Sequence, residues 1–269
     1  MPDLAKAAIR NRTKTRKMPD LAKAATRNRA KTRKMPDFGV AGVKINGYLC
    51  ANFLKRMYKL IIFDFDGTLA DTRELIIRTN QESQKAMGHE PVSEDIIQGT
   101  IGLPLAEGIM AQMPELTPQD MPAWCATYRR IFDVLKSQYV PAIFPHVKET
   151  LEALHSQGCV LSVASSRLSV SLNDFLRQMG LAPLFKLVLG ADNVTAAKPD
   201  PAPVLQTMQE LGFTPEDTLV VGDMPVDILM GSRAGAKTCG VTFGNSCREE
   251  LTAAGADYVI DDMAKLLEL

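Results

Sequence analysis

The sequence predicts an α/β fold, a doubly wound parallel sheet with an inserted α-helical region. From Met57 onward, short apolar runs rich in β-branched residues alternate with helical stretches, which is typical of a parallel sheet covered by helices. Residues 88–145, which follow the first apolar run and the first helical stretch, are also helical in character but are interrupted by prolines such as Pro91 and Pro104. We therefore expect a sheet whose first two strands are separated by inserted helices.

The first predicted strand, Lys59–Phe63 (KLIIF), is a short β-branched and aromatic run that ends at Asp64, as expected for a buried strand. A helix is expected from about Thr72 to Met87. The helix Pro201–Leu211 has its proline in the first turn, where a missing N–H costs nothing. The other predicted helices are Val147–Ser156, Val170–Met179 and Val226–Ala234. The other predicted strands are Cys159–Ala164, Leu187–Leu189, Leu219–Val221, Lys237–Thr242 and Asp257–Ile260.

The composition is that of a folded chain. With 269 residues, 46% of them hydrophobic, the chain is long enough for one large domain or two smaller ones. No signal peptide is expected, because no long apolar core follows the basic start, and no apolar run reaches the roughly 18–20 residues that span a bilayer. Its five cysteines are scattered without a Cys-x-x-Cys pair, so neither a disulfide scaffold nor a structural zinc site is expected. We expect a cytoplasmic monomer or homodimer with no membrane partner.

The net charge of zero conceals an uneven distribution. Residues 1–56 contain 15 Lys or Arg and three acidic residues, whereas the rest of the chain is acidic. Residues 1–17 and 18–34 are two copies of one unit that differ at two positions. We expect this tail to be disordered, or to be upstream DNA translated from a start codon assigned too early, because each unit opens with Met and Met57 precedes an ordinary first strand.

Two functional interpretations of the tail stay open. A basic arm could bind nucleic acid by neutralising phosphates, and an Arg-rich start could be an organelle transit peptide. Aromatic residues, which would support base stacking, are absent from residues 1–34. A nucleic-acid-associated protein that acts through the arm is therefore the alternative of another class, and nucleic acid is not the partner that we expect.

Polar residues follow the predicted strands, at the sheet edge where ligands bind in doubly wound folds. They lie in Asp64–Thr68 (DFDGT), Ser165–Arg167 (SSR), Ala197–Pro201 (AKPDP) and Gly222–Asp227 (GDMPVD). Asp64 and Asp66 can face the same side of an extended segment, and two such carboxylates repel each other unless a cation lies beside them. The serines and the guanidinium of the second segment suit an anion.

From these segments we expect one pocket to hold four carboxylates, one Lys, one Arg and two Ser: Asp64, Asp66, Asp223, Asp227, Lys198, Arg167, Ser165 and Ser166. Taken singly, each has an ordinary interpretation, for example a turn and a helix cap for the first two carboxylates and a solvated side chain for the lysine. Their joint occurrence would be costly in an apolar core. A hard divalent cation on oxygen ligands balances the charges, and at a phosphate site such ligands favour Mg²⁺.

In order and spacing the four segments resemble the motifs of the haloacid dehalogenase-like superfamily of phosphohydrolases. DFDGTLADT is similar to its first motif, VASS to its second, the Lys of AAKPDP to its third and GDMPVD to its fourth. The resemblance covers about residues 58–269. The stretch from Ala234 onward and the helical insert also resemble the phosphoglycolate phosphatase-like branch. This implies a core of residues 57–72 and 147–269 and a helical cap of residues 73–146.

The resemblance also implies roles for the residues. Asp64 would be the nucleophile, Asp66 the general acid and base, and Ser165 a hydrogen-bond donor to the phosphoryl group. Lys198 would neutralise the charge that gathers at the nucleophile. The implied Mg²⁺ ligands are Asp64, Asp66, Asp223 and Asp227. The candidate substrate contacts are Thr68, Ser166, Arg167, Gly102 and Arg129; the last of these could equally be a solvated residue of a helix face.

Asp66 indicates phosphoryl transfer, because the dehalogenase members of the superfamily lack this second Asp. We expect a Mg²⁺-dependent phosphatase that hydrolyses a small-molecule phosphate monoester through an aspartyl-phosphate, with phosphoglycolate among the candidate substrates. A pyrophosphatase and a sugar-phosphate mutase of the same superfamily remain alternatives. The mutase branch usually has Glu-Asp where this chain has Gly222-Asp223.

Overall fold

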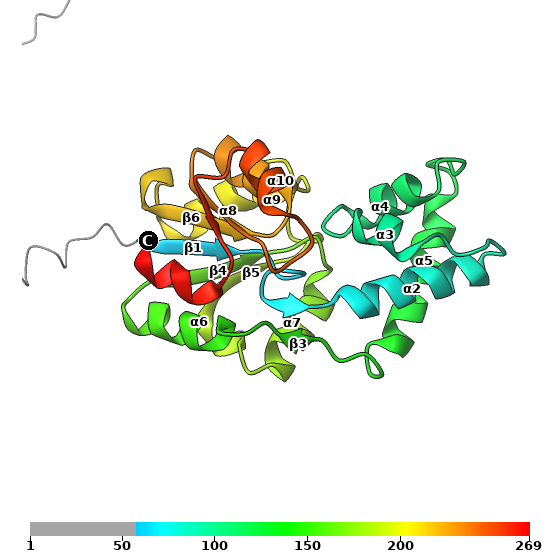
Figure 1. Cartoon of the computed structure of the whole chain (residues 1–269), viewed down its shortest axis with the longest axis horizontal. Coiled ribbons are helices and arrows are strands. Elements are labelled where there is room, and N and C mark those ends of the chain that lie inside the picture. Colours follow the sequence, from blue (N-terminus) through cyan, green and yellow to red (C-terminus); the bar gives the residue numbers. More distant parts are fainter. Residues whose placement is uncertain (1–57) are drawn as a thin grey trace, which may run out of the picture. The chain divides into compact units, whose positions relative to one another are not determined.

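The structure is a computed structural model, and it describes residues 58–269 (Figure 1). The basic tail of residues 1–56, with the interpretations given for it above, lies outside the described residues. A six-stranded sheet forms the centre, in the order β5-β4-β1-β6-β7-β8, and every neighbouring pair is parallel. The strands are β1 (Leu60–Phe63), β4 (Val160–Ala164), β5 (Phe185–Leu189), β6 (Thr218–Gly222), β7 (Lys237–Val241) and β8 (Tyr258–Ile260). The predicted doubly wound α/β fold is confirmed.

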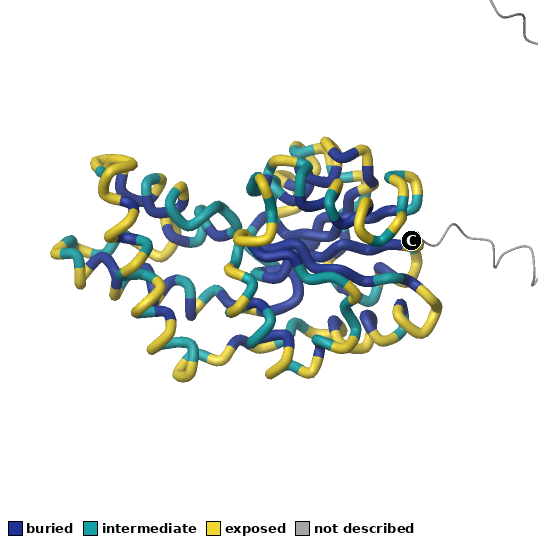
Figure 2. The backbone as a smooth tube through the Cα atoms, turned by 180° about the vertical axis from the view of Figure 1, so that it is seen from behind, coloured by how far each residue is buried: buried dark blue, intermediate teal, exposed yellow. Residues whose placement is uncertain are grey.

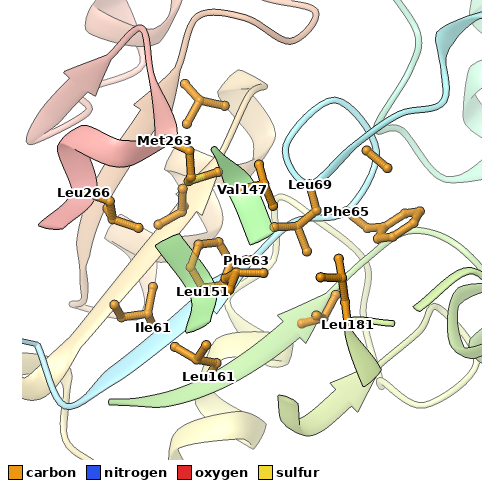
Figure 3. Close-up of a cluster of buried hydrophobic side chains, with 14 of the residues drawn as sticks. Ile61, Phe63, Phe65, Leu69, Val147, Leu151, Leu161, Leu181, Met263 and Leu266 are labelled. Atoms are coloured by element: carbon orange, nitrogen blue, oxygen red, sulfur yellow. The ribbon is translucent and has the colours of Figure 1, made fainter. Parts of the chain in front are cut away.

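Helices cover both faces of this sheet because the side chains of each strand alternate between the faces. Ile61 and Phe63 of β1 belong to a large apolar cluster with helix α6 and the C-terminal turn η4, and Figure 3 shows part of this cluster. Leu60 and Ile62 point the other way, into a cluster with α8 and α9. Figure 2 shows the strands as the most continuously buried part. The helices of this part are α6 (Val147–Ser156), α7 (Ser169–Gln178), α8 (Ala202–Leu211), α9 (Pro225–Arg233) and α10 (Arg248–Ala253), with short 3₁₀ turns η2 (Ala182–Leu184), η3 (Pro215–Asp217) and η4 (Met263–Glu268).

Between β1 and α6 the chain inserts four helices, and Figure 1 shows them beside the sheet rather than on its faces. They are α2 (Arg73–Ala86), α3 (Glu94–Gln98), α4 (Leu105–Gln112) and α5 (Met121–Leu135). They have an apolar cluster of their own around Ile109 and Trp124. A small antiparallel pair, β2 (Ala70–Asp71) with β3 (Ala142–Ile143), joins the chain where it leaves the sheet and where it returns.

Most predicted elements are present, with ends that differ by at most two residues. The strand predicted at Leu187–Leu189 begins two residues earlier, at Phe185. Helix α10 and the β2–β3 pair were not predicted from the sequence. Two-residue strands are too short to show any alternation of polar and apolar residues. Within residues 58–269 no helix combines the length and the apolar character needed to cross a membrane.

Candidate active site

A buried cluster of charged side chains lies where β1 and β6 end. The backbone N–H of Asp64 donates to the carbonyl of Val221 at 2.8 Å, which extends the pairing of the two strands to the first carboxylate. Lys198, from the segment before α8, donates through Nζ to Asp64 Oδ1 at 2.5 Å and to Asp227 Oδ1 at 2.6 Å. All three side chains are nearly inaccessible to solvent. One ammonium group therefore joins residues that are more than 100 positions apart in the sequence.

Asp223 is held by hydrogen bonds from two other loops. The Thr68 hydroxyl donates to its Oδ1 at 3.1 Å, and the backbone N–H and side-chain amide of Asn245 both donate to its Oδ2 at 2.8 Å. Gly67 passes so close that a Cβ atom there would lie 2.2 Å from Oδ2 of Asp223, and its φ of +85° also favours glycine. Gly67 and Thr68, which follow Asp66, thus help to fix the position of the Asp223 carboxylate.

The carboxylates of the cluster suit a divalent cation. Asp64, Asp223 and Asp227 each offer an oxygen within 4.8 Å of the others, and all three are buried. Burial, reinforced by Asp227, raises the pKa of Asp223 to about 7. Burial also raises the pKa of Asp64 well above its usual value; Lys198 opposes this rise and the neighbouring carboxylates add to it. Negative charge therefore exceeds what one lysine neutralises, and an all-oxygen site of this kind fits Mg²⁺.

The charge on Lys198 is itself secured by this cluster. Burial lowers the pKa of its ammonium group, but Asp227 and Asp64 outweigh burial, and the net result is a raised pKa. Lys198 is therefore a permanent cation beside the Asp64 carboxylate, in a place from which water is almost excluded.

Asp66 is paired with Arg167. The Nε atom of Arg167 donates to both carboxylate oxygens, at 3.0 and 3.1 Å, and Nη2 bonds to Oδ1 as well. The guanidinium carbon lies 5.1 Å from the ring centre of Phe132 on α5 and 5.2 Å from that of Phe175 on α7. Arg167 thus connects the second carboxylate of the first motif with one of the inserted helices, a contact that the sequence analysis did not predict.

The two serines after β4 have different environments. Ser165 is buried, and its Oγ accepts a hydrogen bond from the backbone N–H of Arg167 at 3.2 Å. Ser166 donates through Oγ to the carbonyl of Gly102 at 2.8 Å, which ties the loop before α4 to the sheet. Gly102 has a φ of +94°, and a Cβ atom there would lie 3.3 Å from Cγ of Met224. The loop around Gly102 therefore packs directly on the strand ends.

A chamber of about 420 Å³ lies between the strand ends and the inserted helices. Six of the predicted site residues line it: Asp64, Asp66, Gly102, Arg129, Ser166 and Arg167. Arg129 is exposed and contributes to the wall from α5. The other five belong to the buried layer around the strand ends: Thr68, Ser165, Lys198, Asp223 and Asp227. The structure therefore gathers the predicted residues into one region, with Asp64 both in the buried cluster and on the chamber wall.

Three residues of the site were missed by sequence reasoning. Asn245 holds Asp223, and Gly244 lies so close to Asp223 that a Cβ atom would be 2.4 Å from its side chain. Arg73 donates to the carbonyl of Gly244 at 2.8 Å and supports this loop. The available signal was positional, since the Gly-Asn-Ser sequence follows β7 as the four recognised segments follow their strands.

Known proteins are similar to this chain over the same region. Residues 61–241 match the haloacid dehalogenase-like hydrolase family. A phosphoglycolate phosphatase of Vibrio cholerae is 32% identical over 217 residues, which is 78% of this chain and 96% of the relative. A pyrophosphatase PpaX of Anoxybacillus flavithermus is 32% identical over 209 residues, covering 78% of this chain and 95% of the relative. The solved structure of a predicted phosphoglycolate phosphatase from Haemophilus somnus has a TM-score of 0.71 at 27% identity, over 80% of this chain and 98% of that one.

The parallel sheet with polar strand ends and the matches together define a class of protein, a hydrolase that acts on phosphate esters. The chain belongs to the haloacid dehalogenase-like hydrolases. The resemblance predicted from the four motifs is confirmed.

Proposed function

We propose that the protein is a Mg²⁺-dependent phosphatase that hydrolyses a small-molecule phosphate monoester through an aspartyl-phosphate at Asp64. The observation that carries the proposal is the position of Asp64. It lies on the chamber wall, and behind it Lys198 is bonded to its Oδ1 at 2.5 Å. A carboxylate that faces a ligand chamber, with a fixed cation at its back, suits attack on an anionic phosphate.

In the first step, a carboxylate oxygen of Asp64 attacks phosphorus, and the bond between phosphorus and the ester oxygen breaks. Asp66 donates a proton to the departing oxygen, so that an alcohol leaves. In the second step Asp66 takes a proton from water, the water oxygen attacks phosphorus, and the bond to Asp64 breaks to release phosphate. Because Asp66 is paired with Arg167 in this structure, that ion pair must loosen before Asp66 can carry a proton.

The roles of the other residues follow from their contacts. Ser165, buried at the end of β4, would donate to the transferring phosphoryl group, and Lys198 offsets the charge on Asp64 throughout. Thr68 uses its hydroxyl on Asp223, which supports a role in holding this carboxylate in addition to the predicted substrate contact. The remaining proposed substrate contacts line the chamber: Gly102, Arg129, Ser166 and Arg167.

Asp64, Asp223 and Asp227 are the side chains that would hold Mg²⁺, and the family resemblance adds the backbone carbonyl of Asp66. When bound, the ion screens the negative charges of the carboxylates and of the phosphate. Its binding would counteract the burial, and the repulsion between carboxylates, that raise the pKa of Asp64 and of Asp223. The fit rests on three buried carboxylates whose oxygens lie within 4.8 Å of one another.

We also propose the domain division given by the motifs, with a core of residues 57–72 and 147–269 and a cap of residues 73–146. The separate apolar cluster around Ile109 and Trp124 supports it, as does the β2–β3 pair close to both proposed boundaries. The cap would exclude water from the reacting groups.

The experiment measures phosphate release by the full chain. Candidate substrates are phosphoglycolate and pyrophosphate, after the names of the relatives, together with nucleoside monophosphates and hexose phosphates. We expect release that EDTA abolishes and that Asp64→Asn lowers by at least about 10³-fold, whereas Asp174→Asn, in an exposed ion pair, retains full activity. Folded wild-type protein that releases phosphate from none of these esters in Mg²⁺ would contradict the proposal.

A further inference from the structure

The wall of the chamber is mainly apolar. Its aliphatic and aromatic members come from α2, α4, α5, the loop before α4 and the start of α7; they include Ile76, Ile101, Leu103, Ile109, Phe132 and Val170. Only Asp64 and Asp66 bring carboxylates of the reaction centre to it, at the end formed by the strands. A ligand that fills the chamber must therefore present most of its surface to hydrocarbon.

The polar side chains of the wall are largely engaged within the protein. Gln112 donates through Nε2 to the Thr100 hydroxyl at 2.8 Å, and Asn80 donates through Nδ2 to the carbonyl of Ile76 at 2.9 Å. Ser166 donates to the carbonyl of Gly102. Hydrogen-bonding capacity that is already used inside the protein is not free to replace the water around a strongly polar ligand.

The cations of the wall are similarly engaged. Lys136 is paired with Asp133 at 2.8 Å, and Arg167 with Asp66. Arg129 is the one wall cation for which residues 58–269 supply no ion-pair partner, and it is exposed. A second phosphate group would bring about two further negative charges into the chamber. One free guanidinium matches a single negative charge better.

Contacts between the inserted segment and the strand ends border the chamber on two sides. The Ser166–Gly102 hydrogen bond and the approach of Gly102 to Met224 hold one side, and the stacking of Phe132 on Arg167 holds another. The volume of about 420 Å³ lies within the roughly 300–1,000 Å³ of cavities that bury drug-sized ligands. The glycolate part of phosphoglycolate, with two carbon atoms and a carboxylate, would fill little of it.

We propose that the natural substrate is a phosphate monoester whose alcohol has an apolar body, alkyl or aryl, and at most one further negative charge. This inference rests on the proposed phosphatase function and narrows its substrate class. The phosphate would meet Asp64, the apolar body would pack on the hydrocarbon of the wall, and a charged end, where there is one, would reach Arg129.

The test compares kcat/KM of the full chain, in Mg²⁺, for ethyl, butyl, hexyl and benzyl phosphate beside phosphoglycolate and pyrophosphate. We expect kcat/KM to rise with chain length by up to about fourfold per methylene, the factor that corresponds to about 0.8 kcal/mol per buried CH₂. Hexyl and benzyl phosphate should exceed phosphoglycolate and pyrophosphate. A flat or falling series, or a preference for either of the two anionic substrates, would overturn the inference.

Two matched variants make the test specific. Ile76→Thr places a hydroxyl on the wall and should flatten the rise with chain length. Ile96→Thr makes the same change on α3, at a side chain that is 47% exposed and does not line the chamber, and should leave the series unchanged. Equal slopes in the two variants would count against the inference. If wild-type protein hydrolyses none of the esters, the proposed phosphatase function itself fails, whereas hydrolysis without dependence on the apolar body refutes only the substrate class.

Discussion

Replacing Asp223 by Asn should stabilise the metal-free protein at alkaline pH. Burial raises the pKa of Asp223 from its ordinary value of 3.8 to about 7, so the folded state holds a proton that the unfolded state releases. The stability that depends on this proton is complete below about pH 4 and is lost as pH rises through about 7. The loss amounts to about 4 kcal/mol. Asn at position 223 avoids this loss of stability because its side chain carries no charge at any pH.

The substitution can also preserve the hydrogen bonds of this position. The carbonyl oxygen of Asn can accept from both donors of Asn245, and its amide can donate to the Thr68 hydroxyl, which accepts as readily as it donates. We therefore expect Asp223→Asn to be about 2–4 kcal/mol more stable than wild type at pH 8 in EDTA. At pH 4.5 the variant should be more stable by only about 1 kcal/mol or less.

Urea unfolding of the full chain in EDTA at the two pH values measures this difference. Added Mg²⁺ should raise the stability of the wild type more than that of the variant, because the variant lacks one ligand carboxylate. The control Asp174→Asn, in an exposed ion pair, should show neither effect. A variant that is less stable than wild type at pH 8 in EDTA would refute the reasoning about the charge of this cluster.

Three further substitutions test the contacts of the site. Lys198→Met leaves two buried carboxylates without their cation and should cost about 3–5 kcal/mol in EDTA by urea unfolding; unchanged stability would contradict the ion pairs. Gly67→Ala adds a Cβ atom 2.2 Å from Asp223 Oδ2 at a positive φ, so it should lower the free energy of unfolding by about 2 kcal/mol or more. It should also weaken the rise in Tm on adding Mg²⁺, and a rise equal to that of the wild type would contradict this packing. Ser166→Ala removes the bond to Gly102 and should raise KM while it changes stability by only about 1 kcal/mol; an unaltered KM would show that the loop needs no such tie.

The sheet could be predicted from the sequence because its strands are buried on both faces. Runs such as Leu60–Phe63 are continuously apolar, and the glycines and prolines between elements mark where each begins and ends. The β2–β3 pair could not be predicted, since two residues carry no periodicity and Ala142 meets Asp71 only through the tertiary fold.

The gathering of the charged residues was predictable for a topological reason. The carboxyl ends of parallel strands meet at one edge, so Asp64 and Asp223 had to be neighbours once β1 and β6 were adjacent. The pairing of Asp66 with Arg167 was not predictable, because it depends on which way a long side chain turns between the rings of Phe132 and Phe175. These aromatic residues are over 40 positions apart, and their contact arises from the packing of α5 against α7.

The central claim is that Asp64 becomes covalently phosphorylated during turnover, and chemical trapping tests this most directly. The full chain would be quenched in acid during hydrolysis of its best substrate in Mg²⁺, reduced with borohydride, digested and analysed by mass spectrometry. Reduction of an aspartyl-phosphate yields homoserine, and we predict it at position 64, with none in samples that lack substrate and none in Asp64→Asn. Active enzyme that releases phosphate but yields no modification at Asp64, or that carries it on another residue, would contradict the mechanism.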